Sequence, residues 1–327
     1  MLGWSLLATA ISFVLTYILT ERLISACLKY GHLSEDVHKS GRPKVPKFGG
    51  ASAPISISIV CLIFSYLLPE LSVILQSYSI SVALGGLVGA LDDALRLGGK
   101  SKPVLAAVPA LPLIAYGAYS GRPFLPMVGR ARLTLVTPLA LLPYMSIMAN
   151  ASNMIDALNG LLPSALIVAL CAICIEGAVL GSAGTVMISL ISIGALLAYL
   201  CFNRFPARTF AGNVGSFGIG VAAAAAAVPA GLEMMYVIST LPMMVSGFFT
   251  IATMGFREKS ERRARPILVT EDALLEANPD PSAPLTLIPM LTLTSPKSEP
   301  RVVAESVLLF AFSSVLSLLT FVLTLWR

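Results

Sequence analysis

Long apolar runs separated by short polar segments dominate the pattern of this chain. The runs are helix-sized, and they lack the strand-sized alternation of polar and apolar positions that a membrane β-barrel requires. The pattern therefore predicts an all-α polytopic membrane protein with about ten transmembrane helices in a single integral membrane domain, residues 1–327. The expected spans are 2–26, 49–68, 71–91, 103–119, 133–151, 160–180, 182–202, 213–232, 234–255 and 303–325.

Composition excludes an ordinary soluble protein. The 327 residues are 56% hydrophobic and 12% charged, and the mean hydropathy is +0.85. A soluble domain of this length does not need so much apolar surface. The five cysteines all lie in or beside apolar runs, so we interpret them as packing side chains and not as redox or zinc ligands.

Basic residues predict the orientation in the membrane. Most of the 22 lysines and arginines lie in one set of alternate connections, and few lie in the other set. Because basic loops stay in the cytoplasm, we expect this set to be cytoplasmic and both termini to lie outside. The net charge of +5 then belongs to the cytoplasmic loops and makes no case for nucleic-acid binding.

The most conspicuous polar positions follow the third apolar run. This run leads directly into the adjacent carboxylates Asp92 and Asp93, and Lys102 follows in the same connection. Ionised side chains at the end of a membrane helix are unfavourable unless they meet water, a cation or each other. An acid pair followed by bases suits a site for phosphate and a metal ion. An ordinary charged helix end in contact with the cytoplasm is the alternative.

Amide and carboxylate side chains mark two further connections. Asn150, Asn153, Asp156 and Asn159 recur every three residues, which on a helix would make a polar stripe that cannot face lipid. Their oxygens are ligands of the kind that Mg²⁺ prefers, and a hydrogen-bonded seam between helices is the alternative. Asn213 stands where the next helix enters the membrane, so its side chain could reach a ligand.

Two connections offer basic groups to an anion. In the first, Lys39 and Arg42 alternate with proline and glycine, which predicts an extended, turned segment. The last contains an arginine cluster with Arg263 and Arg265, and guanidinium groups bind phosphate oxygens in pairs. A membrane-surface anchor is the alternative for both. In the larger cytoplasmic loop 256–302, the segments 266–270 and 285–294 are expected to make either short strands or a hairpin-like flap.

Five motifs, in chain order, resemble those of the polyprenyl-phosphate N-acetylhexosamine-1-phosphate transferases (glycosyltransferase family 4): DVHKSGRPKVPKFGG, GALDDALRLGGKSK, NASNMIDALNGL, FNRFPARTFAGNVGSFGIG and RRARP. The resemblance covers about residues 36–265. It is nearer to the dolichyl-phosphate GlcNAc-1-phosphotransferase branch, because the last large loop has paired arginines and no histidine. An archaeal plasma membrane is the expected location.

The resemblance implies a fold, a reaction and partners. The fold would have ten helices, both ends outside and an active site on the cytoplasmic face. The enzyme would transfer N-acetylhexosamine-1-phosphate, with GlcNAc-1-phosphate expected, from a UDP-sugar to a polyprenyl or dolichyl phosphate and release UMP. This is the first step of lipid-linked glycan assembly, and Mg²⁺ is the implied cofactor, with Mn²⁺ as a substitute. The implied partners are these substrates and the bilayer, and a homodimer stays open.

The resemblance also implies roles for individual residues. Asp92 and Asp93 would orient or deprotonate the lipid phosphate, and Lys39 and Arg42 would support that phosphate or the loop geometry. The implied site residues are, for catalysis, Asp92, Asp93 and Lys102; for substrate binding, Lys39, Arg42, Asp156, Asn159, Arg263 and Arg265; and for the metal, Asn153 and Asn213.

One position departs from the family pattern. Most of the family carries an aspartate in the fourth motif as a magnesium ligand, whereas this chain has Asn213. An amide oxygen can coordinate Mg²⁺, but the change removes one negative charge. Compensation by Asp92, Asp93 or Asp156, weak metal binding and loss of activity are the open alternatives. A secondary transporter is the rival of another class, disfavoured because the polar motifs gather at one face and no repeat is visible.

Overall fold

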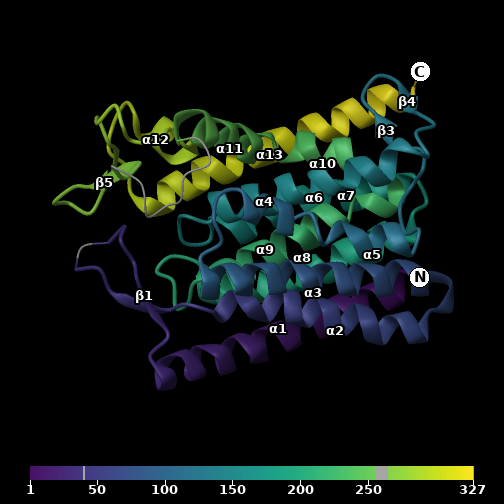
Figure 1. Cartoon of the computed structure of the whole chain (residues 1–327), viewed down its shortest axis with the longest axis horizontal. Helices are drawn as coiled ribbons and strands as arrows, with labels where there is room; N and C mark the ends of the chain where they lie inside the picture. Colours follow the sequence, from purple (N-terminus) through teal and green to yellow (C-terminus); the bar gives the residue numbers. More distant parts are fainter. Residues whose placement is uncertain (40, 255–263, 327) are drawn as a thin grey trace.

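Helices that run along one common direction make up most of the protein (Figure 1). The computed structural model describes residues 1–39, 41–254 and 264–326. The α-helices are α1 (Leu2–Tyr30), α2 (Ser52–Leu67), α3 (Ser72–Leu95), α4 (Ser101–Leu105), α5 (Ala110–Ala115), α6 (Val136–Ile155), α7 (Leu161–Val179), α8 (Ala183–Asn203), α9 (Gly212–Ala225), α10 (Glu233–Ser239), α11 (Leu241–Met254), α12 (Leu287–Thr292) and α13 (Glu299–Leu325). Short 3₁₀ turns lie at Gly49–Ala51, Pro69–Leu71 and Val228–Ala230.

The long helices confirm a polytopic helical membrane protein. Within the described residues, seven helices are long and apolar enough to cross a membrane. The pair α10 and α11, bent by 77° at the break between them, is an eighth candidate. The expected span 133–151 lies on α6, and the span 103–119 lies on two short helices, α4 and α5. The count of ten spans therefore stays a prediction.

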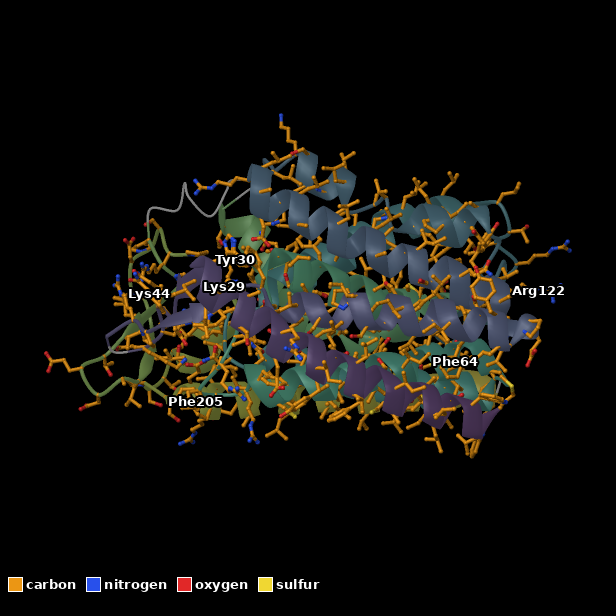
Figure 2. The ribbon with its side chains drawn as sticks, turned by 90° about the horizontal axis from the view of Figure 1, so that it is seen from below. Lys29, Tyr30, Lys44, Phe64, Arg122 and Phe205 are labelled. Carbon is orange, nitrogen blue, oxygen red and sulfur yellow. The ribbon has the colours of Figure 1, made fainter. Side chains whose placement is uncertain are left out.

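The two ends of the bundle differ. Both chain termini lie at one end, and β1 and β5 lie at the other (Figure 1). Figure 2 shows Lys29, Lys44 and Phe205 at the β1 end and Arg122 at the opposite end. Many large apolar side chains, such as those of Leu139 and Phe312, are exposed on helices between the two ends. Such a surface suits a hydrocarbon environment along the sides of the bundle.

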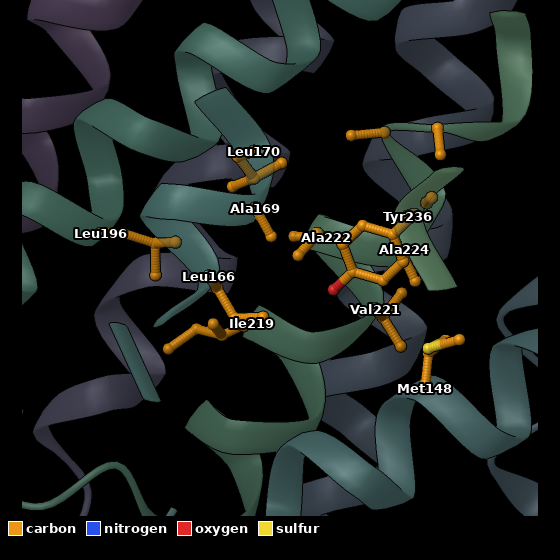
Figure 3. Close-up of a cluster of buried hydrophobic side chains, with 14 of the residues drawn as sticks. Met148, Leu166, Ala169, Leu170, Leu196, Ile219, Val221, Ala222, Ala224 and Tyr236 are labelled. Atoms are coloured by element: carbon orange, nitrogen blue, oxygen red, sulfur yellow. The ribbon is translucent and has the colours of Figure 1, made fainter. Parts of the chain in front are cut away.

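Helix α9 occupies the core because its side chains are small. The alanine run 222–227 is buried throughout, and small residues let neighbouring helices approach closely. Figure 3 shows Ala222 of α9 between Leu170 of α7 and Tyr236 of α10, with Met148 of α6 nearby. The alanine run therefore lets these helices pack closely around α9.

Glycine brings α3 against the beginning of α9. A Cβ atom added at Gly89 would lie 2.1 Å from the backbone oxygen of Asn213 and 2.7 Å from the Cα atom of Val214. Only a residue without a side chain allows this backbone contact. Because Asp92 lies one turn further along α3, the same contact places its carboxylate beside the Asn213 side chain.

Three short antiparallel hairpins lie outside the helices. They are β1 (Leu33–Glu35) with β2 (Lys44–Pro46), β3 (Phe124–Leu125) with β4 (Gly129–Arg130), and β5 (Ile267–Val269) with β6 (Leu275–Ala277). The first hairpin confirms the extended, turned geometry expected for the first basic loop. The second hairpin lies where the sequence pattern predicts no strand.

The third hairpin corrects a prediction. The strand expected at 266–270 is present as β5, but its partner is β6 and not the segment 285–294. That segment contains helix α12 instead. The reason is a tight turn directly after β5, where Ala273 has a φ of 59° and the chain reverses at once.

Candidate functional site

Four helices bring polar side chains into one closed cluster at the β1 end of the bundle. Lys102 Nζ of α4 bonds to Asp92 Oδ2 of α3 at 2.6 Å and to Asn153 Oδ1 of α6 at 3.3 Å. Asn153 Nδ2 donates to Asn213 Oδ1 of α9 at 2.8 Å, and Asn213 Nδ2 donates to Asp92 Oδ2 at 2.7 Å. We call these four residues the central cluster. It unites two predicted catalytic residues with both predicted metal ligands.

The second aspartate of the pair points elsewhere. Asp93 Oδ1 forms an ion pair with Lys47 Nζ at 2.8 Å, and Asp93 Oδ2 accepts the backbone N–H of Val214 at 3.2 Å. Val214 lies in the first turn of α9, where unpaired N–H groups favour an anion. The adjacent carboxylates therefore have different environments, Asp92 inside the central cluster and Asp93 between the first loop and α9.

A second cluster surrounds Lys39. Its ammonium group forms ion pairs with Asp36 and, at 3.0 Å, with Glu299 Oε2 at the start of α13. Asn159 donates its backbone N–H to Glu299 Oε1 at 2.8 Å and its Nδ2 to Asp36 Oδ2 at 3.1 Å. We call these four residues the Lys39 cluster. Because two carboxylates already hold the ammonium, the contacts favour a role for Lys39 in loop geometry over direct contact with a phosphate.

Sequence reasoning missed Asp36 and Glu299. Asp36 stands three residues before Lys39 in the first motif, a spacing that could have suggested the pairing. Glu299 offers no such signal, because it lies 140 residues from Asn159, in a stretch of sequence with no recognisable motif. Only the approach of α13 to the loop after α6 reveals its role.

Two neighbouring hollows open beside these clusters. The smaller, about 210 Å³, is lined by Lys47, Asn153, Asp156, Asn159 and Asn213, among others. The larger, about 1280 Å³, is lined by Lys39, Arg42, Asp156 and Arg265, together with parts of α11, β5 and α12. Asp156 and His38 belong to both walls. Burial lowers the pKa of His38 below its ordinary value, which favours a neutral imidazole in this wall.

Apart from Asp93 and Arg263, the predicted site residues belong to the two clusters or line the two hollows. Arg263 lies outside the described residues, so the structure places only Arg265 of the predicted pair, and the pairing stays a prediction. Arg265 and Arg42 both line the larger hollow. Such a pair suits an anion with several phosphate oxygens.

The polar stripe expected on one helix is not continuous. Helix α6 ends at Ile155, Asp156 is its C-cap, and Asn159 lies in the loop that follows. The chain turns there because Gly160, with a φ of 82°, begins the connection into α7. Asn150 bonds back to Ser146 O at 2.8 Å. Asn153, Asp156 and Asn159 nevertheless line the same smaller hollow, because the turn brings the last two residues back towards it.

The donor set is of the kind that the implied metal requires. Asp92 and Asp93 offer carboxylates, and Asn153 and Asn213 offer amide oxygens, all hard ligands. Among the described residues, no three His, Cys, Asp or Glu side chains are grouped so that they could hold a metal ion. Mg²⁺ is commonly bound by one or two carboxylates together with substrate phosphates. The residues present fit that kind of site, in which the substrate completes the coordination.

Comparisons with known proteins place the chain in a family. Residues 75–231 match the model described as glycosyl transferase family 4. A protein of Sulfolobus acidocaldarius is 31% identical over 224 residues, which cover 66% of this chain and 68% of that protein. The chain belongs to glycosyl transferase family 4. The family match includes the whole central cluster, whereas Asp36, Lys39 and Glu299 lie outside it.

Three of the relatives carry two different names. The Sulfolobus protein and one from Saccharolobus solfataricus, 28% identical over 255 residues (76% of this chain, 78% of that protein), carry one provisional name. That name is UDP-N-acetylglucosamine–dolichyl-phosphate N-acetylglucosaminephosphotransferase. A protein of Shouchella clausii, 33% identical over 280 residues (77% of this chain, 81% of that protein), is named phospho-N-acetylmuramoyl-pentapeptide-transferase. The family resemblance inferred from the motifs is confirmed.

Proposed function

We propose that this family 4 protein transfers N-acetylhexosamine-1-phosphate, GlcNAc-1-phosphate in the first instance, from a UDP-sugar to a polyprenyl or dolichyl phosphate. The observation that carries the proposal is the central cluster. Four motif-bearing segments converge on it at one end of a membrane bundle, beside hollows large enough for a nucleotide sugar. The names of the relatives point to the same substrate classes.

The reaction is a phosphoryl transfer. An oxygen of the lipid phosphate attacks the β-phosphorus of the UDP-sugar and forms a new P–O bond. The P–O bond to UMP breaks, and UMP leaves with the electron pair. Catalysis of such a step consists mainly of positioning and of stabilising negative charge. Both are tasks that the basic side chains around the two hollows can perform.

The chain's own residues then have distinct tasks. Lys102, held by Asp92 and Asn153, presents a fixed positive charge to phosphate oxygens at the central cluster. Arg42 and Arg265 bind the diphosphate from the larger hollow. Asp156 and Asn159 face the nucleotide side, and the Lys39 cluster holds Asn159 in place.

A divalent cation is part of the proposal. Mg²⁺, or Mn²⁺ in its place, would be held by oxygens of Asp92, Asp93, Asn153 and Asn213 together with phosphate. When bound, it supplies positive charge that offsets the charge of the two phosphate groups.

The membrane arrangement is also proposed. We infer ten crossings, both termini outside, and the two hollows on the cytoplasmic face of the plasma membrane. The position of both termini at the end opposite β1 supports an even number of crossings. The basic residues Lys29 and Lys44 at the β1 end support a cytoplasmic location for that end.

UMP release tests the function. Purified protein with UDP-GlcNAc, polyprenyl phosphate and Mg²⁺ is expected to release UMP, and omission of the lipid phosphate should abolish release. Lys102→Met removes the fixed charge and should lower the rate by roughly 100-fold or more. Lys100→Met is the matched control, because Lys100 is exposed two residues away and should tolerate the change.

Two results would contradict the proposal. The first is absence of UMP release with every UDP-sugar tried from protein that remains folded. The second is equal activity in the Lys102→Met and Lys100→Met variants. Uptake of UDP-sugar into vesicles without UMP release would instead favour a secondary transporter.

A further inference from the structure

The charges in contact at the centre of the site balance. Asp92 pairs with Lys102 at 2.6 Å, and Asp93 pairs with Lys47 at 2.8 Å. The two carboxylates and two ammonium groups therefore sum to zero. The amides of Asn153 and Asn213 complete the cluster without adding charge. This arrangement gives a free divalent cation little net attraction to the central cluster.

Asn213 closes the cluster through both atoms of its amide. Its Nδ2 donates to Asp92 Oδ2 at 2.7 Å, and its Oδ1 accepts from Asn153 Nδ2 at 2.8 Å. These partners decide which way the amide points, because the reverse orientation would set Oδ1 against the carboxylate and Nδ2 against another NH₂ group. The same Asn153 Nδ2 also donates to Ser216 Oγ at 2.7 Å.

The oxygens that could hold a cation are therefore already engaged. Lys102 donates to Asn153 Oδ1, and Asn153 donates to Asn213 Oδ1. A cation entering here would have to displace an ammonium group or turn an amide over. Asp156 lines both hollows, and Arg42 and Arg265 line the larger of them with it.

An aspartate at position 213 would behave in the opposite way. It has no N–H to donate, so it would set a second carboxylate against Asp92, where a hydrogen bond of 2.7 Å now lies. Two ionised carboxylates at that distance are mutually unfavourable unless a cation lies between them. The Asn213 amide thus avoids the repulsion between two carboxylates. It also lacks the negative charge that would attract a metal ion to the protein in the absence of substrate.

We propose that Asn213 makes the central cluster stable without a metal ion, so that the divalent cation arrives with the nucleotide diphosphate and does not bind beforehand. The diphosphate brings the negative charge that the side chains lack. This inference rests on the proposed function for its ligand, a nucleotide diphosphate. It concerns the order of binding and not the identity of the sugar or the lipid.

Mn²⁺ binding tests this order directly. Purified full-length protein is titrated with Mn²⁺, with and without UDP, and the electron spin resonance signal of free Mn²⁺ reports how much Mn²⁺ is bound. The wild-type protein alone should bind Mn²⁺ at least 10-fold more weakly than the wild-type protein with UDP, after correction for Mn²⁺ bound by UDP itself. Asn213→Asp should bind Mn²⁺ without UDP at least 10-fold more tightly than the wild type.

Two control variants separate the position from the charge. Asn213→Ser removes the amide without adding charge and should not gain Mn²⁺ binding. Asn150→Asp adds a carboxylate to α6 outside the central cluster, and it should also not gain binding. A gain in either control equal to that of Asn213→Asp would overturn the inference.

The wild-type titrations decide the matter even if Asn213→Asp does not fold. Equal Mn²⁺ affinity with and without UDP would overturn the inference, whatever the variants do. Failure of the proposed function is distinguishable from this result. A protein that recruits Mn²⁺ with UDP but never releases UMP refutes the transfer reaction and leaves the binding order intact.

Discussion

Glu299 shows how a single residue can organise a site from outside every motif. Its side chain is only 4% exposed, yet it lies at the first turn of the last long helix. One oxygen holds the ammonium group of Lys39, and the other accepts the backbone N–H of Asn159. Loss of this buried carboxylate is destabilising, because Lys39 would keep only one of the two carboxylates that neutralise its charge.

Replacement of Glu299 tests this role. Glu299→Gln can still accept the N–H of Asn159 but loses the ion pair with Lys39, at a cost of about 3 kcal/mol in the free energy of unfolding. We expect a lower thermal midpoint and a KM for the UDP-sugar that rises more than kcat falls, because the proposed function places Asn159 on the nucleotide side. Thermal unfolding in detergent and steady-state UMP release measure the two effects.

Glu305→Gln is the matched control on the same helix. Glu305 pairs with Lys297 and Arg301 at the surface, where an ion pair contributes little. The control should leave the midpoint and the KM nearly unchanged. Equal effects of the two substitutions would show that the Lys39 cluster does not position the site.

At the scale of elements, the contact between α3 and α9 decides the geometry of the central cluster. The two helices touch through backbone at Gly89, so Asp92 and Asn213 come within hydrogen-bond distance across 121 residues of sequence. Asp93 uses the same contact to reach the N–H of Val214. Both halves of the acid pair therefore depend on one close helix crossing.

Gly89→Ala should separate these helices. The added Cβ atom would lie 2.1 Å from a backbone oxygen that no side-chain rotation can move, so we expect a loss of about 1–3 kcal/mol in stability. Gly86→Ala is the control on the same helix, because its Cβ would meet the nearest atom at 3.8 Å. Thermal midpoints in detergent compare the two, and equal midpoints would contradict the close packing of α3 against α9.

At the scale of the whole molecule, the candidate functional site lies at one end of an apolar bundle. The central cluster, the Lys39 cluster and both hollows lie at the end that carries β1 and β5, far from the two termini (Figure 1). This separation is what a membrane enzyme with one water-soluble and one lipid substrate requires. A test of the proposed orientation must therefore determine whether the end with β1 and β5 faces the cytoplasm.

Thiol labelling checks the orientation. In a variant with its five native cysteines replaced by alanine, Arg130→Cys should react with a membrane-impermeant maleimide in intact cells. Lys44→Cys should react only after the cells are permeabilised, because β2 lies at the opposite end of the bundle. The reverse pattern would show that both termini are cytoplasmic and that the positive-inside interpretation is wrong.

The apolar runs and the motif residues by themselves determined much of this protein. Helix-sized apolar runs have one stable outcome in a membrane, so the class of fold followed from local composition. Family membership followed from five motifs, because each kept its own residues and order. Asp92, Lys102, Asn153 and Asn213 could be named as site residues for the same reason.

Contacts between distant segments could not be obtained in this way, because they depend on how the helices pack. No motif in the sequence predicts that Glu299 pairs with Lys39. Asp92 and Asp93 are adjacent in the sequence, but they form ion pairs with different lysines. It also continues a three-residue period through Asp156 and Asn159, past the point where α6 ends. Tertiary packing alone decided that an amide at position 213 meets Asp92, and with it the charge balance of the site.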